Sequence, residues 1–387
     1  MKKKNRFFAL YGFELLKILK NKVAMITLAV MFVFTFIQGE FEVRGNIDPA
    51  DLSAYRETDG QVIDDALIGE MLAATDDYGN LTGAEDLKYT DVRDWVGNVM
   101  ERNSNFKNVP AFENVDAKRV YSEREELIEA GYGSLKLTES EKEYWREKEK
   151  DLEKPFVMYD NTVSYGVTEG TSNYGIYMII LIATGIASVF AIETQRRTDP
   201  MIRSAINGSK ELYLAKVLAG MTYVMASLAM VVLGFFSYVG LVWGFVGMKA
   251  KIQITYPLAV ADMTMWQVEL AILALLITFS FLLTAVALFV SNVTRNGVAT
   301  MAIVIGGSFG MFIISTVVPL EQRVLSQVTS ILSPAIISPH VVYDYRLIKL
   351  GTMLTEYQAV PIIYVLLGIV FIAAGYWFYS RYEIKNN

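Results

Sequence analysis

The chain has 387 residues, of which 53% are apolar and 20% are charged, and it contains no cysteine. Soluble proteins average about 45–50% apolar and about 25% charged residues, so this composition favours a membrane protein. The lack of cysteine excludes disulfides, thiol catalysis and cysteine-based metal sites.

The acidic residues are concentrated in one part of the chain. Residues 39–172 hold 31 Asp and Glu against 15 Lys and Arg, a net charge of −16, whereas the remainder has a net charge of +10. This distribution predicts one acidic, hydrophilic domain inserted into a basic, apolar chain, and it excludes a single soluble core. The acidic domain also argues against nucleic acid as a partner.

The first 22 residues predict an amphipathic helix that lies in the lipid headgroup layer, with its basic side toward anionic membrane lipid. Its apolar positions recur at helical spacing: Phe7, Phe8, Tyr11, Leu15, Ile18 and Leu19. Lys20 and Lys22 predict a break before the first membrane span. The alternative is that this segment only extends that span inward.

Six apolar stretches approach the roughly 20 residues that a helix needs to span a bilayer. They are residues 23–37, 174–192, 217–247, 268–290, 297–318 and 360–379. The third has 31 residues, so we expect it to be tilted, broken or extended beyond the bilayer. Within the spans, Glu269 at the edge of the fourth is nearly the only ionisable residue, which disfavours an ion-coupled transporter.

These stretches predict an all-α polytopic membrane protein with six transmembrane helices. The predicted units are an N-terminal cytoplasmic interfacial helix at 1–22, transmembrane helix 1 at 23–38, a mainly helical extracytoplasmic acidic domain at 39–172, and transmembrane helices 2–6 at 173–387. With both termini inside, the inner segments carry 15 Lys and Arg against five in the short outer loops, as the positive-inside rule requires. No small-x-small pattern follows the first span, so we expect no signal-peptide cleavage.

Three capping signals predict helix starts in the acidic domain. They are Asp48 before Pro49, Ser122 with Glu125, and Thr138 with Glu141. Gly131 is expected to end the second of these helices and Pro155 the third. The third helix has a thin apolar face and is predicted to be a solvated strut, with recognition of a cationic peptide as the alternative. No clustered metal-ligand spacing occurs in the domain, so no metal site is predicted.

The extracytoplasmic loop at 319–359 is half apolar and contains Pro334 and Pro339. It is expected either to dip into the membrane as a re-entrant element or to cap the membrane surface. The only histidine, His340, lies in this loop and is interpreted as a loop residue rather than a ligand or base.

The cytoplasmic loop at 193–216 predicts a short helix over Asp199–Ile206, with Asp199 as N-cap and Pro200 in the first turn. Asn207 and Gly208 are expected to end it. Its apolar stripe consists of Met201, Ile202, Ala205 and Ile206. A short helix with such a stripe suits docking into a groove of another protein. A plain juxtamembrane loop is the alternative.

In this loop an acidic residue ends one span, a basic stretch and a short helix follow, and a Gly-Ser break precedes a lysine at the start of the next span. This order resembles the coupling loop of the ABC-2 family of ABC transporter permeases, and the overall layout is similar too. The resemblance implies a coupling helix that docks on a separate ABC ATPase subunit. The implied coupling residues are Glu193, Arg196, Arg197, Asp199, Met201, Ile202, Ala205, Ile206 and Lys216.

The resemblance implies the transmembrane permease subunit of a bacterial ABC exporter in the cytoplasmic (plasma) membrane, paired with a second permease copy or a paralogue. Its substrate would be amphipathic: a peptide such as an antimicrobial peptide, an antibiotic, or a lipid. The chain has no G-x-x-x-x-G-K-[ST] phosphate loop, so it is not expected to be an enzyme, and ATP and Mg²⁺ would bind to the partner subunit. No cofactor is expected in this chain.

Two other functions compete with this one. The first is a membrane-anchored extracytoplasmic receptor or scaffold without transport activity. The second is a passive channel, for which the hydroxyls of Ser280 and Thr284, one helical turn apart, offer only weak support because such groups often bond their own backbone.

Overall fold

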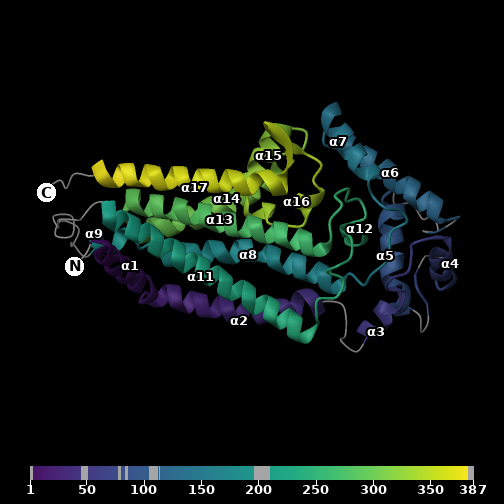
Figure 1. Cartoon of the computed structure of the whole chain (residues 1–387), viewed down its shortest axis with the longest axis horizontal. Helices are drawn as coiled ribbons and strands as arrows, with labels where there is room; N and C mark the ends of the chain where they lie inside the picture. The colour runs from purple at the N-terminus through teal and green to yellow at the C-terminus, as the bar shows by residue number, and fades with distance from the viewer. Residues whose placement is uncertain are drawn as a thin grey trace.

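The computed structural model describes residues 3–44, 51–76, 80–82, 86–103, 112, 114–195 and 210–381. Over these ranges the chain is mostly helical, with one two-stranded sheet. Figure 1 shows an elongated molecule in which a bundle of long helices carries a smaller helical body at one end. The start of α1 and the end of α17 lie at the opposite end, here named the terminal end. The end that carries the smaller body is named the insert end.

Six helices of the described chain are long and apolar enough to cross a membrane, which fits a multi-pass membrane protein. They are α2 (Lys22–Arg44), α8 (Thr162–Ile186) with its continuation α9 (Ala191–Gln195), α11 (Lys210–Val242), α13 (Met265–Thr294), α14 (Gly297–Val317) and α17 (Glu356–Arg381). Each predicted span coincides with one of them. The third is a single helix of 33 residues, about 50 Å long, so it exceeds the roughly 30 Å hydrocarbon layer.

The bundle is organised around α8 and α13. α13 packs against α8, α11, α14 and α17, while α8 also packs against α2 and α11. In the most apolar 18-residue stretch of each helix, 67% of the residues of α8 and 61% of those of α13 are buried. The corresponding share for α14, at the periphery, is 17%. Glu269, expected at the edge of its span, is fully buried on α13. Thr284 donates its hydroxyl to the Ser280 carbonyl oxygen at 2.6 Å, as expected for a backbone-bonded hydroxyl.

The N-terminal helix α1 (Lys3–Leu19) is separate from α2, which confirms the predicted break. The Asn21 side chain accepts a hydrogen bond from the backbone N–H of Val23 at 3.1 Å and so caps the start of α2. α1 packs along α11, where the Tyr11 hydroxyl donates to Thr222 Oγ1 at 3.0 Å. The first residues therefore form their own element rather than an inward extension of α2.

The smaller body, here named the insert domain, comprises the described residues between 51 and 160. It is helical, as predicted, and its elements are α3 (Leu52–Tyr55), η1 (Arg56–Thr58), α4 (Asp65–Ala73), α5 (Asp86–Asn103), α6 (Ala117–Ser134) and α7 (Glu139–Lys150). A core around Trp95, Val96 and Ile68 holds these helices together.

Two of the predicted helix starts in the insert domain have clear outcomes. Thr138 and Glu141 form the predicted capping box of α7, although the helix ends at Lys150, before the proline expected to stop it. The prediction that Ser122 opens a helix is wrong, because Asp116 caps α6 by accepting from the Arg119 N–H at 2.7 Å. Ser122 and Gly131 thus lie inside α6. The start expected at Asp48 lies outside the described residues.

Two connections complete the insert end. One holds α12 (Ile252–Thr255), and the other holds α15 (Arg323–Leu332), η2 (Pro334–Ile336), α16 (His340–Tyr343), β1 (Leu347–Leu350) and β2 (Thr352–Thr355). The two strands are antiparallel, with Leu347 opposite Thr355, and Gly351 makes the turn at a φ of 82° that suits glycine. The all-α prediction did not include this hairpin. α15 and η2 pack on α14.

The insert domain is bound to the connection between α11 and α13. The fully buried Arg124 donates to the carbonyl oxygens of Pro257 at 2.6 Å and Ala259 at 2.8 Å, and Trp95 Nε1 donates to the Gln253 carbonyl at 2.8 Å. Gly247, at a φ of 70°, passes so close to the Asp160 carbonyl that a Cβ atom would lie 2.2 Å from its oxygen. Ile254 of α12 also lies in the hydrophobic core of the insert domain, so the domain shares its core and its hydrogen bonds with this connection.

Three carboxyl groups meet where the insert domain joins α8. Asp160 is fully buried, its backbone N–H donates to Asp59 at 2.6 Å, and its carboxylate lies 3.6 Å from Arg56 Nε. Burial, followed by the negative charge of Asp160, raises the pKa of Asp91 to about 8. Asp91 is thus protonated in the folded protein at neutral pH.

We expect Asp91 to make the protein less stable as the pH rises. The unfolded chain releases this proton near pH 4 but the folded chain only near pH 8, so between these values unfolding releases a proton and becomes more favourable. Asp91→Asn should flatten the fall in unfolding temperature between pH 5 and about 8. Asp151→Asn, an exposed acid at the end of α7, serves as the control. Equal pH profiles for wild type and Asp91→Asn would contradict the assignment.

Candidate functional site

Four charged side chains form a closed ring of ion pairs at the terminal end. Lys216 Nζ of α11 lies 2.7 Å from Glu193 of α9 and 3.1 Å from Glu14 of α1. Lys17 Nζ of α1 lies 2.7 Å from Glu14 and 3.0 Å from Glu193. Positive and negative charges alternate around the ring, so its net charge is zero. We name these four residues the ion-pair ring.

Three residues of the ion-pair ring are buried, and Lys17 is partly exposed. Lys216 is fully inaccessible, and Glu14 and Glu193 are 3% and 5% exposed. Lys216 also donates to the Val189 carbonyl oxygen at 2.9 Å and lies 5.4 Å from the centroid of the Phe190 ring. A buried ammonium loses its hydration, and here two carboxylates, a carbonyl and an aromatic face replace it.

Lys17 is held in its charged form by the same ring. Burial alone would lower the pKa of its ammonium, but the hydrogen bond and charge of Glu14, together with Glu193, outweigh burial and raise the pKa. Lys17 therefore stays positively charged at physiological pH.

Neighbouring polar and aromatic contacts fix the helices that carry the ring. The Ser291 hydroxyl of α13 donates to the Ala187 carbonyl at 2.8 Å and accepts from the Phe190 N–H at 3.2 Å, which ties the turn between α8 and α9 to α13. The Tyr213 hydroxyl donates to the Ile372 carbonyl at 2.7 Å and so ties α11 to α17. These contacts join the α8–α9 turn to α13, and α11 to α17, at the terminal end.

Two of the predicted coupling residues, Glu193 and Lys216, belong to the ion-pair ring. The others lie outside the described residues: Arg196, Arg197, Asp199, Met201, Ile202, Ala205 and Ile206. Because Glu193 precedes that segment and Lys216 follows it, the ring joins the two ends of the predicted coupling loop to each other and to α1.

The sequence reading missed the contribution of α1 to this site. The sequence predicts that the polar side of this helix faces membrane lipid, whereas the structure turns Glu14 and Lys17 toward α9 and α11. The one available signal was an acidic residue three positions before a lysine in an otherwise basic helix.

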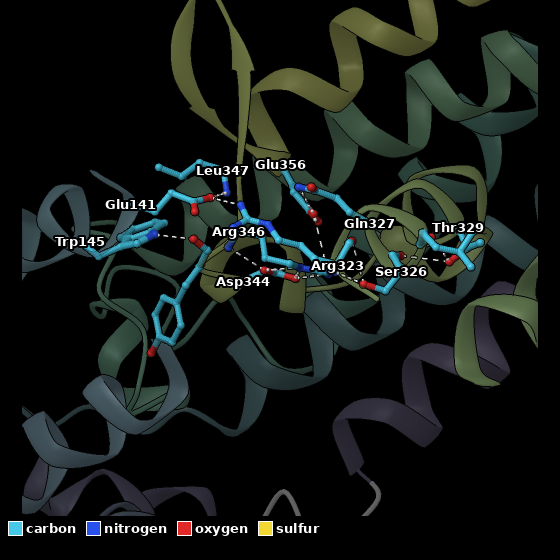
Figure 2. A network of polar contacts seen from close by, with 12 residues as sticks. Glu141, Trp145, Arg323, Ser326, Gln327, Thr329, Asp344, Arg346, Leu347 and Glu356 are labelled. Atoms are coloured by element: carbon cyan, nitrogen blue, oxygen red, sulfur yellow. Dashed lines mark hydrogen bonds and ion pairs between the residues drawn. The ribbon is translucent and has the colours of Figure 1, made fainter. Parts of the chain in front are cut away.

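A second polar network joins the insert domain to the connection between α14 and α17 (Figure 2). The Glu141 carboxylate of α7 accepts from the Arg323 side chain and from the Leu347 N–H at 3.0 Å. Trp145 Nε1 of α7 donates to the Tyr345 carbonyl at 2.7 Å. Burial would raise the pKa of Glu141, but the bond from Arg323 and the backbone donors outweigh burial and lower the pKa.

The same network continues to the start of α17. Arg346 pairs with Asp344, donates to the Ser326 hydroxyl of α15 at 3.1 Å, and lies 3.8 Å from Glu356 in the first turn of α17. Gln327 Nε2 of α15 donates to Glu356 at 3.1 Å (Figure 2). The prediction of a solvated strut is therefore wrong for one face of α7, because that face is docked on this connection.

No family model matches the chain, and neither the curated proteins nor the solved structures contain a significant match.

Replacing Lys216 by Met should strongly destabilise the protein. The change leaves two buried carboxylates with one lysine, and removing one partner of a buried ion pair costs about 3–5 kcal/mol. Unfolding of the purified chain in mixed micelles, followed by tryptophan fluorescence, measures the loss. Adding Glu193→Gln should restore part of the stability, because it removes the unmatched charge.

Lys20→Met, which removes an exposed lysine between α1 and α2, is the matched control. If Lys216→Met and Lys20→Met lowered the free energy of unfolding equally, the ion-pair ring would not stabilise the fold as proposed.

Replacing Arg323 by Met should release α7 from its docking surface. Backbone amides of α7 should then exchange hydrogen about tenfold faster, which corresponds to about 1.4 kcal/mol of lost protection. Hydrogen exchange read by mass spectrometry measures this, with α13 as the internal reference. Lys349→Met, an exposed change on the neighbouring β1, should leave α7 unchanged. Unchanged exchange of α7 in Arg323→Met would show that the network does not hold the helix.

Proposed function

We propose that this chain is the transmembrane permease subunit of an ATP-driven exporter of the ABC-2 type, in a bacterial plasma membrane with both termini in the cytoplasm. A separate ATPase subunit would bind ATP and Mg²⁺ and dock on the coupling loop at 193–216. The chain would move an amphipathic substrate such as a peptide, an antibiotic or a lipid.

The ion-pair ring is the observation that carries this proposal. A loop that receives mechanical input needs both of its ends fixed to the helices that it must move. Glu193 and Lys216 meet this need, since they lie on either side of the loop and contact each other at 2.7 Å in a buried setting. A plain juxtamembrane loop needs no buried charges, which cost free energy to desolvate.

The layout of the bundle supports the same proposal. Six membrane-length helices exceed what an anchor for an outer receptor requires, and the sequence carries no phosphate loop of its own. The insert domain also bonds to the α11–α13 and α14–α17 connections, so movement of these helices would reach it. An anchored receptor needs neither contact.

The face of α14 supports pairing with a second permease copy or a paralogue. A Cβ atom added at Gly306 or Gly310 would meet no described atom within 4 Å, so this four-residue spacing of glycines faces away from the rest of the described chain. Closely packed membrane helices use such spacing. In this proposal α14 lies against the partner permease.

The proposal predicts that two charges in the coupling loop abolish ATPase binding. Met201→Asp with Ile202→Asp would place two carboxylates on the apolar stripe that enters the ATPase groove. A tagged chain with both changes should lose the ATPase subunit that copurifies with the unmodified chain, and with it the associated transport. The control is Leu350→Asp with Lys349→Asp, which changes the exposed hairpin at the insert end.

Failure would be clear in this design. If the unmodified chain never retains an ATPase, and the Met201 and Ile202 variant transports as well as the control, the permease proposal is wrong. If the Met201 and Ile202 variant still retains the ATPase, docking takes place elsewhere in the chain.

A further inference from the structure

A cavity of about 360 Å³ opens at the seam between the insert domain and the bundle. It is lined by Tyr165 and Glu169 of α8, residues 255–259 at and after the end of α12, His340 and Tyr343 of α16, and Asn98 of α5. Four parts of the chain that are far apart in sequence thus meet around one space. Its volume lies in the range of pockets that hold small ligands.

Aromatic rings form one wall of this cavity. Tyr343 and Tyr256 stack with their ring centroids 5.0 Å apart and an angle of 29° between the rings. The row continues to His340, 4.7 Å from Tyr343, and to Tyr165, 6.4 Å from Tyr256. An aromatic face carries partial negative charge and attracts cations, most strongly where water is partly excluded.

A carboxylate, Glu169, lies beside the aromatic row. Glu169 Oε1 accepts a hydrogen bond from the Tyr256 hydroxyl at 3.1 Å, which holds the acid beside the rings. Among the described residues that line the cavity there is no lysine or arginine, so none of them supplies a charge that would repel a cation.

We propose that this cavity binds an organic monocation, a substituted ammonium group whose alkyl surface packs on Tyr256 and Tyr343 while its charge faces Glu169. Rings supply cation–π attraction and apolar contact together, and the carboxylate supplies the opposite charge. A small inorganic cation would gain little from the rings. The inference does not depend on the proposed function, since it concerns binding by this chain alone.

The ammonium group could come from a free amine or from a lipid headgroup, because both present the same chemistry. The probe for the free form is tetramethylammonium chloride, titrated into the purified full chain in detergent. Sodium chloride at the same ionic strength is the reference. We expect saturable binding by calorimetry, and a rise in unfolding temperature that sodium does not produce.

Variants separate the aromatic wall from the charge. Tyr343→Leu should weaken binding about tenfold, whereas Tyr343→Phe keeps the ring and should bind as the wild type does. Glu169→Gln keeps an acceptor for the Tyr256 hydroxyl but removes the charge, and should also weaken binding about tenfold or more. Glu143→Gln, an exposed acid on α7, is the matched control and should not change binding.

A lipid source is tested by embedding the chain in phosphatidylcholine or phosphatidylglycerol discs. If tetramethylammonium binds more weakly in phosphatidylcholine discs than in phosphatidylglycerol discs, the lipid headgroup is the occupant. Equal binding in the two kinds of disc would identify a free cation. The inference is overturned if sodium reproduces the effect of tetramethylammonium. It is also overturned if Tyr343→Leu and Glu169→Gln both bind as tightly as the wild type. None of these results depends on an ATPase, so they leave the permease proposal to its own test.

Discussion

The matching of buried charge at the terminal end is the constraint on which the arrangement of the helices depends. Lys216 cannot be removed from water unless carboxylates accompany it, and these come from α1 and α9. A second lysine, Lys17, balances the two acids. The N-terminal helix, the turn after α8 and the start of α11 must therefore lie together. The segment between α9 and α11 consequently begins and ends at one fixed point.

The insert end is held by a different principle. There, besides the ion pairs of Glu141 and Arg346, backbone carbonyls of the connecting segments accept hydrogen bonds from side chains of the insert domain. Arg124 and Trp95 serve the connection between α11 and α13, and Trp145 serves the one between α14 and α17. Without the insert domain, these backbone carbonyls of the two connections would lose their hydrogen-bond donors.

These two ends give the proposals a common physical basis. α11 carries Lys216 of the ion-pair ring near its start and leads at its other end to the connection that Arg124 and Trp95 bind. The cavity with Tyr256 and Glu169 lies at that connection. A displacement of the coupling loop would act on α11, whose other end leads to the connection that lines the proposed cation site.

The sequence by itself determined the six spans, the break after α1 and the capping box at Thr138, because hydropathy and capping are properties of neighbouring residues. The sequence analysis placed the start of α6 at Ser122, whereas the N-cap of this helix is Asp116. Only the tertiary structure decided the ion-pair ring, the docked face of α7 and the aromatic cavity. In the ring, Lys216 meets Glu14 from 202 positions away, and no local pattern specifies which distant charge will balance a buried one.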